Sequence, residues 1–190
     1  MRHPSIRELF DYWNERRGAR PAPERDDIEP FAIRRVLADA FLLALNPVKG
    51  HPFRLAGTRI CALFGREVKG VSFLDLFALH ARYEMGDLID IVAQESVGLI
   101  ASASELKPPE HASPLELLLL PLAPDGRTDA CLLGALAPHA SSGWLGIRAL
   151  RDLTLGRYRF LATATAHRIP ESIPEGRIRH GLVVYDGGQC

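Results

Sequence analysis

The run LELLLLPL at 115–122 is the feature that most constrains the fold of this chain. Successive residues of a β-strand point to opposite faces of the sheet, so the odd-numbered leucines share one face while Leu118 and Leu120 share the other. A sheet with one solvated face would need only one of these sets to be apolar. We therefore expect both faces of this strand to be covered, one of them by a helix from elsewhere in the chain.

An amphipathic helix near the N-terminus is the nearest candidate for that cover. The segment 5–18 begins with Ser5 and Glu8 in the spacing of a capping box, and Gly18 follows two arginines that suit the end of a helix. Its apolar residues recur at the spacing of one helix face: Ile6, Leu9, Phe10 and Trp13. We expect this face to pack on the sheet against Leu118 and Leu120, or to form a dimer interface that includes these two leucines.

The rest of the chain predicts an α+β fold with antiparallel strands joined by hairpins. Strand-like runs lie at 39–46, 53–57, 98–106, 113–123 and 129–137. Helical patterns lie at 29–37, 59–65, 72–78 and 80–96. The stretch 145–161 is compatible with a strand or an arm, and the residues after it with a loosely ordered tail.

Four short motifs occur in an order that resembles a known family. They are Trp13 in the first helix, the connector RPAPERDDI at 20–28, LAGT at 55–58 and GREVKG at 65–70. The chain resembles a PAS domain, and more closely the stand-alone PAS-like proteins of proteobacteria, a family of largely unknown function. The resemblance covers about 5–137, and the connector is one residue longer before its isoleucine than the family's pattern.

The resemblance implies a five-stranded antiparallel sheet with helices on one face and an N-terminal helix on the sheet or at a dimer interface. It divides the chain into a helix and connector at 1–28, a PAS-like domain at 29–140, and a partly disordered extension at 141–190. It also implies a sensor or adaptor of bacterial signal transduction that binds a small ligand or a protein partner. No effector domain accompanies the module, so we expect a homodimer that acts on a signalling protein in trans.

Thr58 and Arg59 are the polar candidates for ligand binding. Arg59 follows a strand end and could reach an anionic ligand, with the Thr58 hydroxyl as a further donor. The alternative interpretation is structural, with Thr58 capping the next helix and Arg59 lying along the surface. A charged partner such as Asp75 or Glu67 would be a sufficient structural explanation for Arg66.

A set of apolar residues is expected to face the inside of the cupped sheet. These residues are Leu43, Phe53, Leu55, Ile60, Phe64, Leu74, Leu88 and Val92. They would either line a ligand cavity or fill a dry core, and a ligand-free structural dimerisation module is therefore an alternative to the sensor.

No pattern in the chain predicts catalysis. A phosphate-binding glycine loop, a zinc-protease helix motif and a nucleophile elbow are all missing from the sequence. A small-molecule enzyme on a similar cupped sheet is the third interpretation, and it would need an acid–base pair inside the cavity. We expect a non-enzymatic protein with no catalytic residue.

No cofactor or metal is assigned either. Cys61 stands among apolar residues that favour the unreactive thiol, and its surroundings do not match the cysteine motif of flavin-binding PAS domains. His80 at a helix start is the best single candidate for haem, but a surface role is the simpler explanation. Neither haem nor flavin is therefore expected.

The composition favours a cytoplasmic protein. Lysine plus arginine and aspartate plus glutamate each number 23, so the formal net charge is zero and a general nucleic-acid binder is not expected. The three cysteines have no close spacing, which fits a reducing compartment. The most apolar run is much shorter than the roughly 20 residues of a membrane helix, so no membrane contact is expected.

Overall fold

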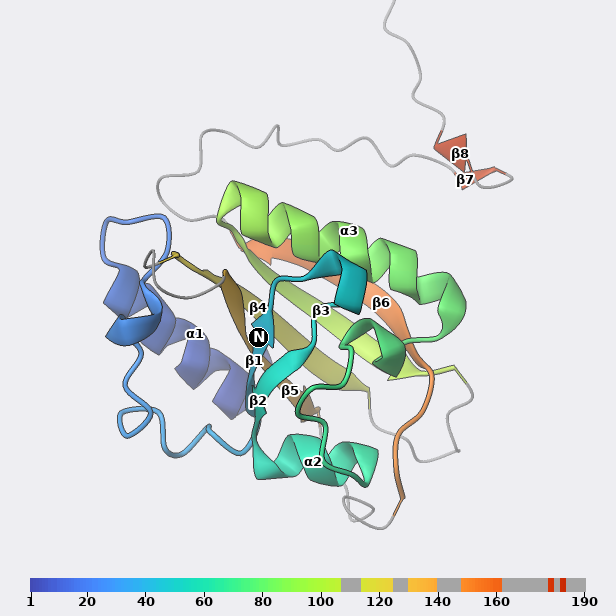
Figure 1. The fold of residues 1–190 in the computed structure, drawn as a ribbon, viewed down its shortest axis with the longest axis horizontal. Helices are drawn as coiled ribbons and strands as arrows, with labels where there is room; N and C mark the ends of the chain where they lie inside the picture. The colour runs from blue at the N-terminus through green and yellow to red at the C-terminus, as the bar shows by residue number, and fades with distance from the viewer. Residues whose placement is uncertain (107–113, 125–129, 140–147, 162–177, 180–181, 184–190) are drawn as a thin grey trace, which may run out of the picture.

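The computed structural model describes residues 1–106, 114–124, 130–139, 148–161, 178–179 and 182–183 (Figure 1). Its helices are α1 (Pro4–Arg17), α2 (Thr58–Phe64) and α3 (Leu79–Glu95), with short 3-10 helices η1 (Arg25–Asp27), η2 (Pro47–Lys49) and η3 (Leu74–Leu76). Its strands are β1 (Ala40–Ala44), β2 (Phe53–Ala56), β3 (Gly98–Glu105), β4 (Leu115–Leu122), β5 (Cys131–Pro138), β6 (Leu153–Leu161), β7 (Ile178–Arg179) and β8 (Leu182–Val183).

The first six strands form one antiparallel sheet in the order β2-β1-β5-β4-β3-β6, and β7 pairs only with β8. The predicted α+β class and antiparallel sheet are confirmed, but the sheet has six strands where five were expected. The additional strand is β6, which pairs along β3 from Gly98 opposite Leu161 to Glu105 opposite Leu153. The sheet therefore includes part of the segment that was assigned to the C-terminal extension, whose remainder falls mostly outside the described residues.

Both faces of the sheet are covered, as the leucine run predicted (Figure 1). Residues of α2, α3 and η3 pack on one face in a cluster that includes Leu117 and Leu119 of β4. On the other face, Leu118 and Leu120 pack in a second cluster with the apolar side of α1. All eight residues of β4 are buried, which explains why the strand needs leucine on both sides.

The helix α1 packs on the sheet of its own chain. Ile6, Leu9, Trp13, Leu118 and Leu120 are each at most 1% exposed, and Phe10 is partly buried against the same cluster. These six residues were expected to form either a helix–sheet contact or a dimer interface. The structure has the helix–sheet contact, so the five buried residues are not available on the surface of the folded chain.

Two local predictions about helices are wrong. The helix α1 is capped by His3, whose side chain accepts a hydrogen bond from the backbone N–H of Ser5, so Ser5 and Glu8 form no capping box. The segment 29–37 is a series of turns with hydrogen bonds such as Val36 N to the Ile33 carbonyl at 2.9 Å, and it continues as turns up to β1. Its apolar residues Ile33 and Val36 are buried in the cluster that α1 forms with the sheet.

Candidate functional site

A pocket of about 910 Å³ opens beside β1 and β2. Its floor consists of side chains from the sheet face that α1 also covers: Ala40, Leu42, Leu122 and Leu133. One wall is the stretch 25–38, and the other is the end of β2 with the following residues 57–58. The pocket floor is therefore on the opposite face of the sheet from the cluster of α2 and α3, although the first residue of α2, Thr58, belongs to the pocket wall.

Gly57 brings the two walls of the pocket together. A Cβ atom at this position would lie 2.1 Å from the carbonyl oxygen of Leu37 and 2.3 Å from that of Ala38. The backbone N–H of Gly57 donates to the Ala40 carbonyl at 2.8 Å, and that of Arg59 donates to the Ala38 carbonyl at 2.9 Å. Only a residue without a side chain permits this approach, so the start of α2 rests directly on the wall segment.

Arg59 forms an ion pair with a buried carboxylate of the same chain. Its Nε and Nη2 atoms donate to the two oxygens of Asp39 at 2.5 and 2.6 Å. The Asp39 side chain is 2% exposed, whereas that of Arg59 is 45% exposed. The hydrogen bond with Asp39 raises the pKa of Arg59 above its ordinary value. Arg59 is thus partly exposed, as the structural interpretation expected, and it is paired with Asp39. It is not among the residues that line this pocket, and ligand binding by Arg59 stays a prediction.

Thr58 and Leu55 line the pocket, but their positions in the fold differ from those predicted from the sequence. Thr58 is the first residue of α2 rather than its cap, since Gly57 holds the cap position without a side-chain hydrogen bond. Leu55 was expected inside the core and is 55% exposed. The register between β1 and β2 shifts between Leu42 and Leu43, and this irregularity places Leu55 opposite Leu42 on the pocket side of the sheet.

Four other residues predicted to bind a ligand are buried on the α2 and α3 side of the sheet. Phe53, Phe64, Leu88 and Val92 are at most 6% exposed and belong to one cluster. The ring of Phe53 meets those of Phe41 and Phe73 with centroids 5.4 and 5.7 Å apart. Their mutual packing is that of a core, and ligand binding by these four residues stays a prediction.

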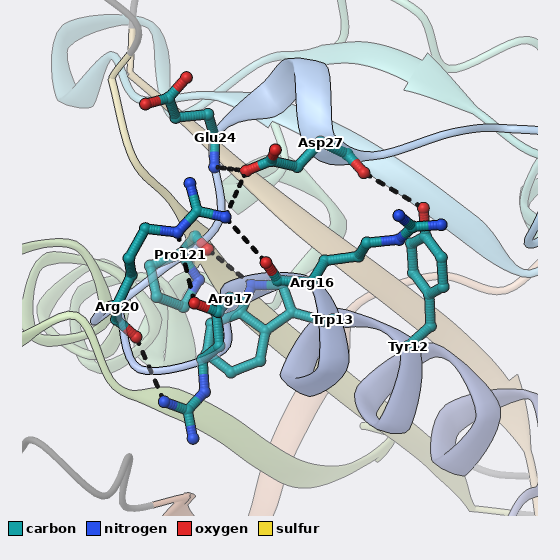
Figure 2. A network of polar contacts seen from close by, with 8 residues as sticks. All are labelled: Tyr12, Trp13, Arg16, Arg17, Arg20, Glu24, Asp27 and Pro121. Atoms are coloured by element: carbon teal, nitrogen blue, oxygen red, sulfur yellow. Dashed lines mark hydrogen bonds and ion pairs between the residues drawn. The ribbon is translucent and has the colours of Figure 1, made fainter.

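The connector at 20–28 ties the pocket wall to α1 through a polar network (Figure 2). The carboxylate of Asp27 accepts from Nη2 of Arg20 at 2.7 Å and from the backbone N–H of Glu24 at 2.9 Å. The Glu24 N–H and the Arg20 guanidinium lower the pKa of Asp27. The Tyr12 hydroxyl donates to the Asp27 carbonyl at 3.3 Å and accepts from the N–H of Glu29 at 2.8 Å.

The same region is bound to the sheet. In Figure 2 the Trp13 indole points toward Pro121 of β4, and its Nε1 donates to the Pro121 carbonyl at 2.8 Å. The N–H of Ala123 donates to the Pro23 carbonyl at 2.8 Å. The Arg20 guanidinium also donates to the Arg16 carbonyl at the end of α1, at 2.8 Å. Helix, connector and strand end thus form one connected unit beside the pocket.

The sequence and the fold were compared with known proteins. A family model described as PAS domain matches residues 1–137, which is most of the chain and includes α1 and the connector. The chain belongs to the PAS domain family. A search of curated proteins found no match. Among solved structures, an RNA-binding Light-Oxygen-Voltage receptor aligns with a TM-score of 0.42 and 16% identity over 57% of this chain. The aligned part spans 33% of that receptor chain.

As a PAS domain, the protein is in general terms a sensor or signalling module. PAS domains commonly mediate protein interactions or dimerisation, and they are typically not catalytic. Within the described part of the chain, no group of three or more His, Cys, Asp and Glu side chains could hold a metal ion. The described helices of this PAS protein are also too short or too polar to cross a membrane.

Sequence reasoning missed Asp39 and the residues of the pocket wall. An aspartate beside an apolar strand-like run was a possible signal, because a carboxylate that close to a core needs a partner. The wall residues had no such signal, because 25–28 were assigned to the connector and 29–37 were predicted to form a short helix. Asp75, a suggested partner for Arg66, instead pairs with Arg82 at 2.6 Å. Cys61 is half-buried: it packs against the apolar cluster of α2 and α3, and its Sγ lies 3.7 Å from a carboxylate oxygen of Glu67.

Proposed function

We propose that this PAS-domain protein is a sensor or adaptor of bacterial signal transduction in the cytoplasm, acting without catalysis on a partner protein in trans. The pocket beside β1 and β2 is the sensing site, and α1 with the connector is the output element. A small ligand in the pocket changes how the connector and α1 pack on the sheet. A homodimer partner or a separate signalling protein then reads this change.

One observation carries the proposal: the stretch 25–38 walls the pocket while its first residues also hold α1. Asp27 contacts Arg20 and Tyr12, and it lies between Asp26 and Ile28, which both line the pocket. A ligand that moves this wall must therefore move or strain the contacts of α1. Such coupling requires that the ligand bind two arrangements of the chain with different free energies.

A pocket-filling variant tests this coupling without knowledge of the ligand. Leu133→Trp adds bulk to the pocket floor and imitates an occupied site, while Leu79→Trp makes the same change at a position on α3 that is 73% exposed. We expect faster amide hydrogen exchange in α1 and in residues 20–28 of Leu133→Trp only. If exchange in α1 is the same in both variants and the parent, the coupling does not exist.

Native mass spectrometry of the protein purified from its own cells examines the ligand directly. A small molecule that is retained by the parent and lost from Leu133→Trp would place the sensing site in the pocket. A small molecule that both proteins retain would place it elsewhere.

A ligand-free dimerisation module is the second candidate, and exposed apolar side chains near the pocket mouth favour it. Phe31 is 76%, Leu55 55% and Leu37 37% exposed. Analytical ultracentrifugation of the parent and Leu55→Asp separates the two candidates. A stable dimer that dissociates in Leu55→Asp, together with no bound small molecule, would favour the dimerisation module over the sensor.

A further inference from the structure

Two arginines that line the pocket differ from nearby arginines in having no carboxylate partner in the described part of the chain. Arg25 and Arg34 both line the pocket, and neither guanidinium forms an ion pair or hydrogen bond with another residue in the described ranges. The guanidinium of Arg34 instead lies over the ring of Phe31, 4.7 Å from its centroid. By contrast, the nearby Arg20 and Arg59 each bind a carboxylate of the chain itself. The positive charges of Arg25 and Arg34 are therefore available to a bound molecule.

The rest of the pocket has the opposite character. Its floor and inner wall are aliphatic, with Ile33, Leu42, Leu122 and Leu133 each at most 7% exposed. Asp26 brings one negative charge to the lining, so the ionisable residues there carry a net positive charge. The volume of about 910 Å³ is within the range of pockets that hold small molecules. The site thus combines an apolar interior with a positively charged border.

We infer that the pocket binds an amphiphilic anion, a small molecule with an aliphatic or aromatic body and one carboxylate. The body lies on the leucine floor, where the removal of apolar surface from water supplies most of the affinity. The carboxylate lies between Arg25 and Arg34, because charge-assisted hydrogen bonds to guanidinium groups are stronger than those between neutral groups. This inference rests on the proposed function, since it names the class of molecule that the sensor detects.

Octanoate and 1-octanol test the inference as a matched pair of probes. They share the apolar chain and differ in the head group, which is anionic only in octanoate. Isothermal titration calorimetry with the full chain should give tighter binding of octanoate, and its affinity should fall as salt is raised while that of 1-octanol stays constant.

Charge-neutral variants then locate the head group. We expect Arg25→Gln and Arg34→Gln each to weaken octanoate about tenfold, as the loss of one charged hydrogen bond would do at a partly exposed site. Binding of 1-octanol should be unchanged in both. Arg35→Gln is the matched control, because Arg35 is exposed and does not line the pocket. Leu133→Trp should abolish binding of both probes.

Four results would overturn the inference. Equal binding of the two probes, with no effect of either arginine, would assign the pocket to neutral ligands. Octanoate binding that survives Leu133→Trp would place the anion outside the pocket. No binding of octanoate would exclude amphiphilic anions as the class of ligand. Self-association that Leu55→Asp abolishes and octanoate does not affect would assign the mouth to a second copy of the chain. The coupling to α1 is judged separately, by hydrogen exchange with saturating octanoate.

Discussion

The ion pair between Asp39 and Arg59 offers the sharpest test of how the pocket region is held together. Asp39 is 2% exposed and precedes β1, while Arg59 belongs to the first turn of α2. Arg59→Ala removes both hydrogen bonds and leaves a buried carboxylate without its cation. Loss of one partner from a fully buried pair costs about 3–5 kcal/mol.

That magnitude must be lowered here because Arg59 is 45% exposed. Water can enter the volume that the guanidinium leaves and solvate part of the Asp39 carboxylate, and solvent already screens the pair. We therefore expect Arg59→Ala to lower the free energy of unfolding by about 2–3 kcal/mol, in the range for loss of hydrogen bonds to a charged group. Asp39→Asn should cost about 1 kcal/mol, because Arg59 can then turn toward water.

Urea unfolding followed by circular dichroism measures these changes. An unchanged slope of the unfolding free energy against urea concentration is the check for two-state behaviour. The double variant Asp39→Asn, Arg59→Ala completes a cycle whose coupling free energy should exceed about 1 kcal/mol. Arg66→Ala is the control, an exposed arginine two residues beyond the end of α2 that should change stability by less than about 0.5 kcal/mol. If Arg59→Ala costs no more than Arg66→Ala, or the coupling is zero, the pair does not hold the structure as argued.

Three further predictions, at Trp13, Gly57 and His51, can be tested by the same unfolding assay. Trp13→Phe should cost about 1–2 kcal/mol because the buried Pro121 carbonyl loses its donor, and Trp13→Ala about 4 kcal/mol because a cavity also forms. A Trp13→Phe cost near zero would refute the role of the hydrogen bond. Gly57→Ala should be strongly destabilising, whereas Gly86→Ala in α3, where a Cβ would lie 3.8 Å from Cδ1 of Leu74, should stabilise by about 1 kcal/mol. Similar effects of the two changes would contradict the close approach at Gly57. Burial lowers the pKa of His51, so the unfolded chain binds the proton more readily and stability should fall as pH drops below about 6.5, with a slope that His51→Leu reduces. An identical slope in His51→Leu would exclude this residue as its source.

The alternation of residues along the leucine run was enough to predict the layered arrangement. Leu118 and Leu120 had to be buried, the first helix had one apolar face of matching character, and the two meet in the structure. The hairpin of β1 and β2 and the helix α3 were also predicted from local pattern, since periodicity and turn residues act within a few residues of each other. The family resemblance rested on motifs that now have physical roles, such as Asp27 in the connector network and Gly57 at the pocket.

The candidate site depended on contacts between distant parts of the chain. Leu55 faces the pocket because the β1–β2 register shifts, a property of strand pairing that the residues of β2 alone do not reveal. Arg59 was a sequence candidate for ligand binding, and only the structure shows that Asp39, twenty positions earlier in the chain, is its ion-pair partner. Arg25 and Arg34 were not predicted to bind a ligand, because no local sequence pattern distinguishes an arginine at a pocket mouth from an arginine elsewhere on the surface.

The sequence by itself therefore determined which faces are apolar, where strands and helices alternate, and that one helix must cover the far side of the sheet. These properties follow from side-chain periodicity, which is written in neighbouring residues. Only the tertiary structure decided which arginines are used internally and which face the pocket. That distinction depends on where the chain brings opposite charges and backbone carbonyls together, and no local pattern encodes those distances.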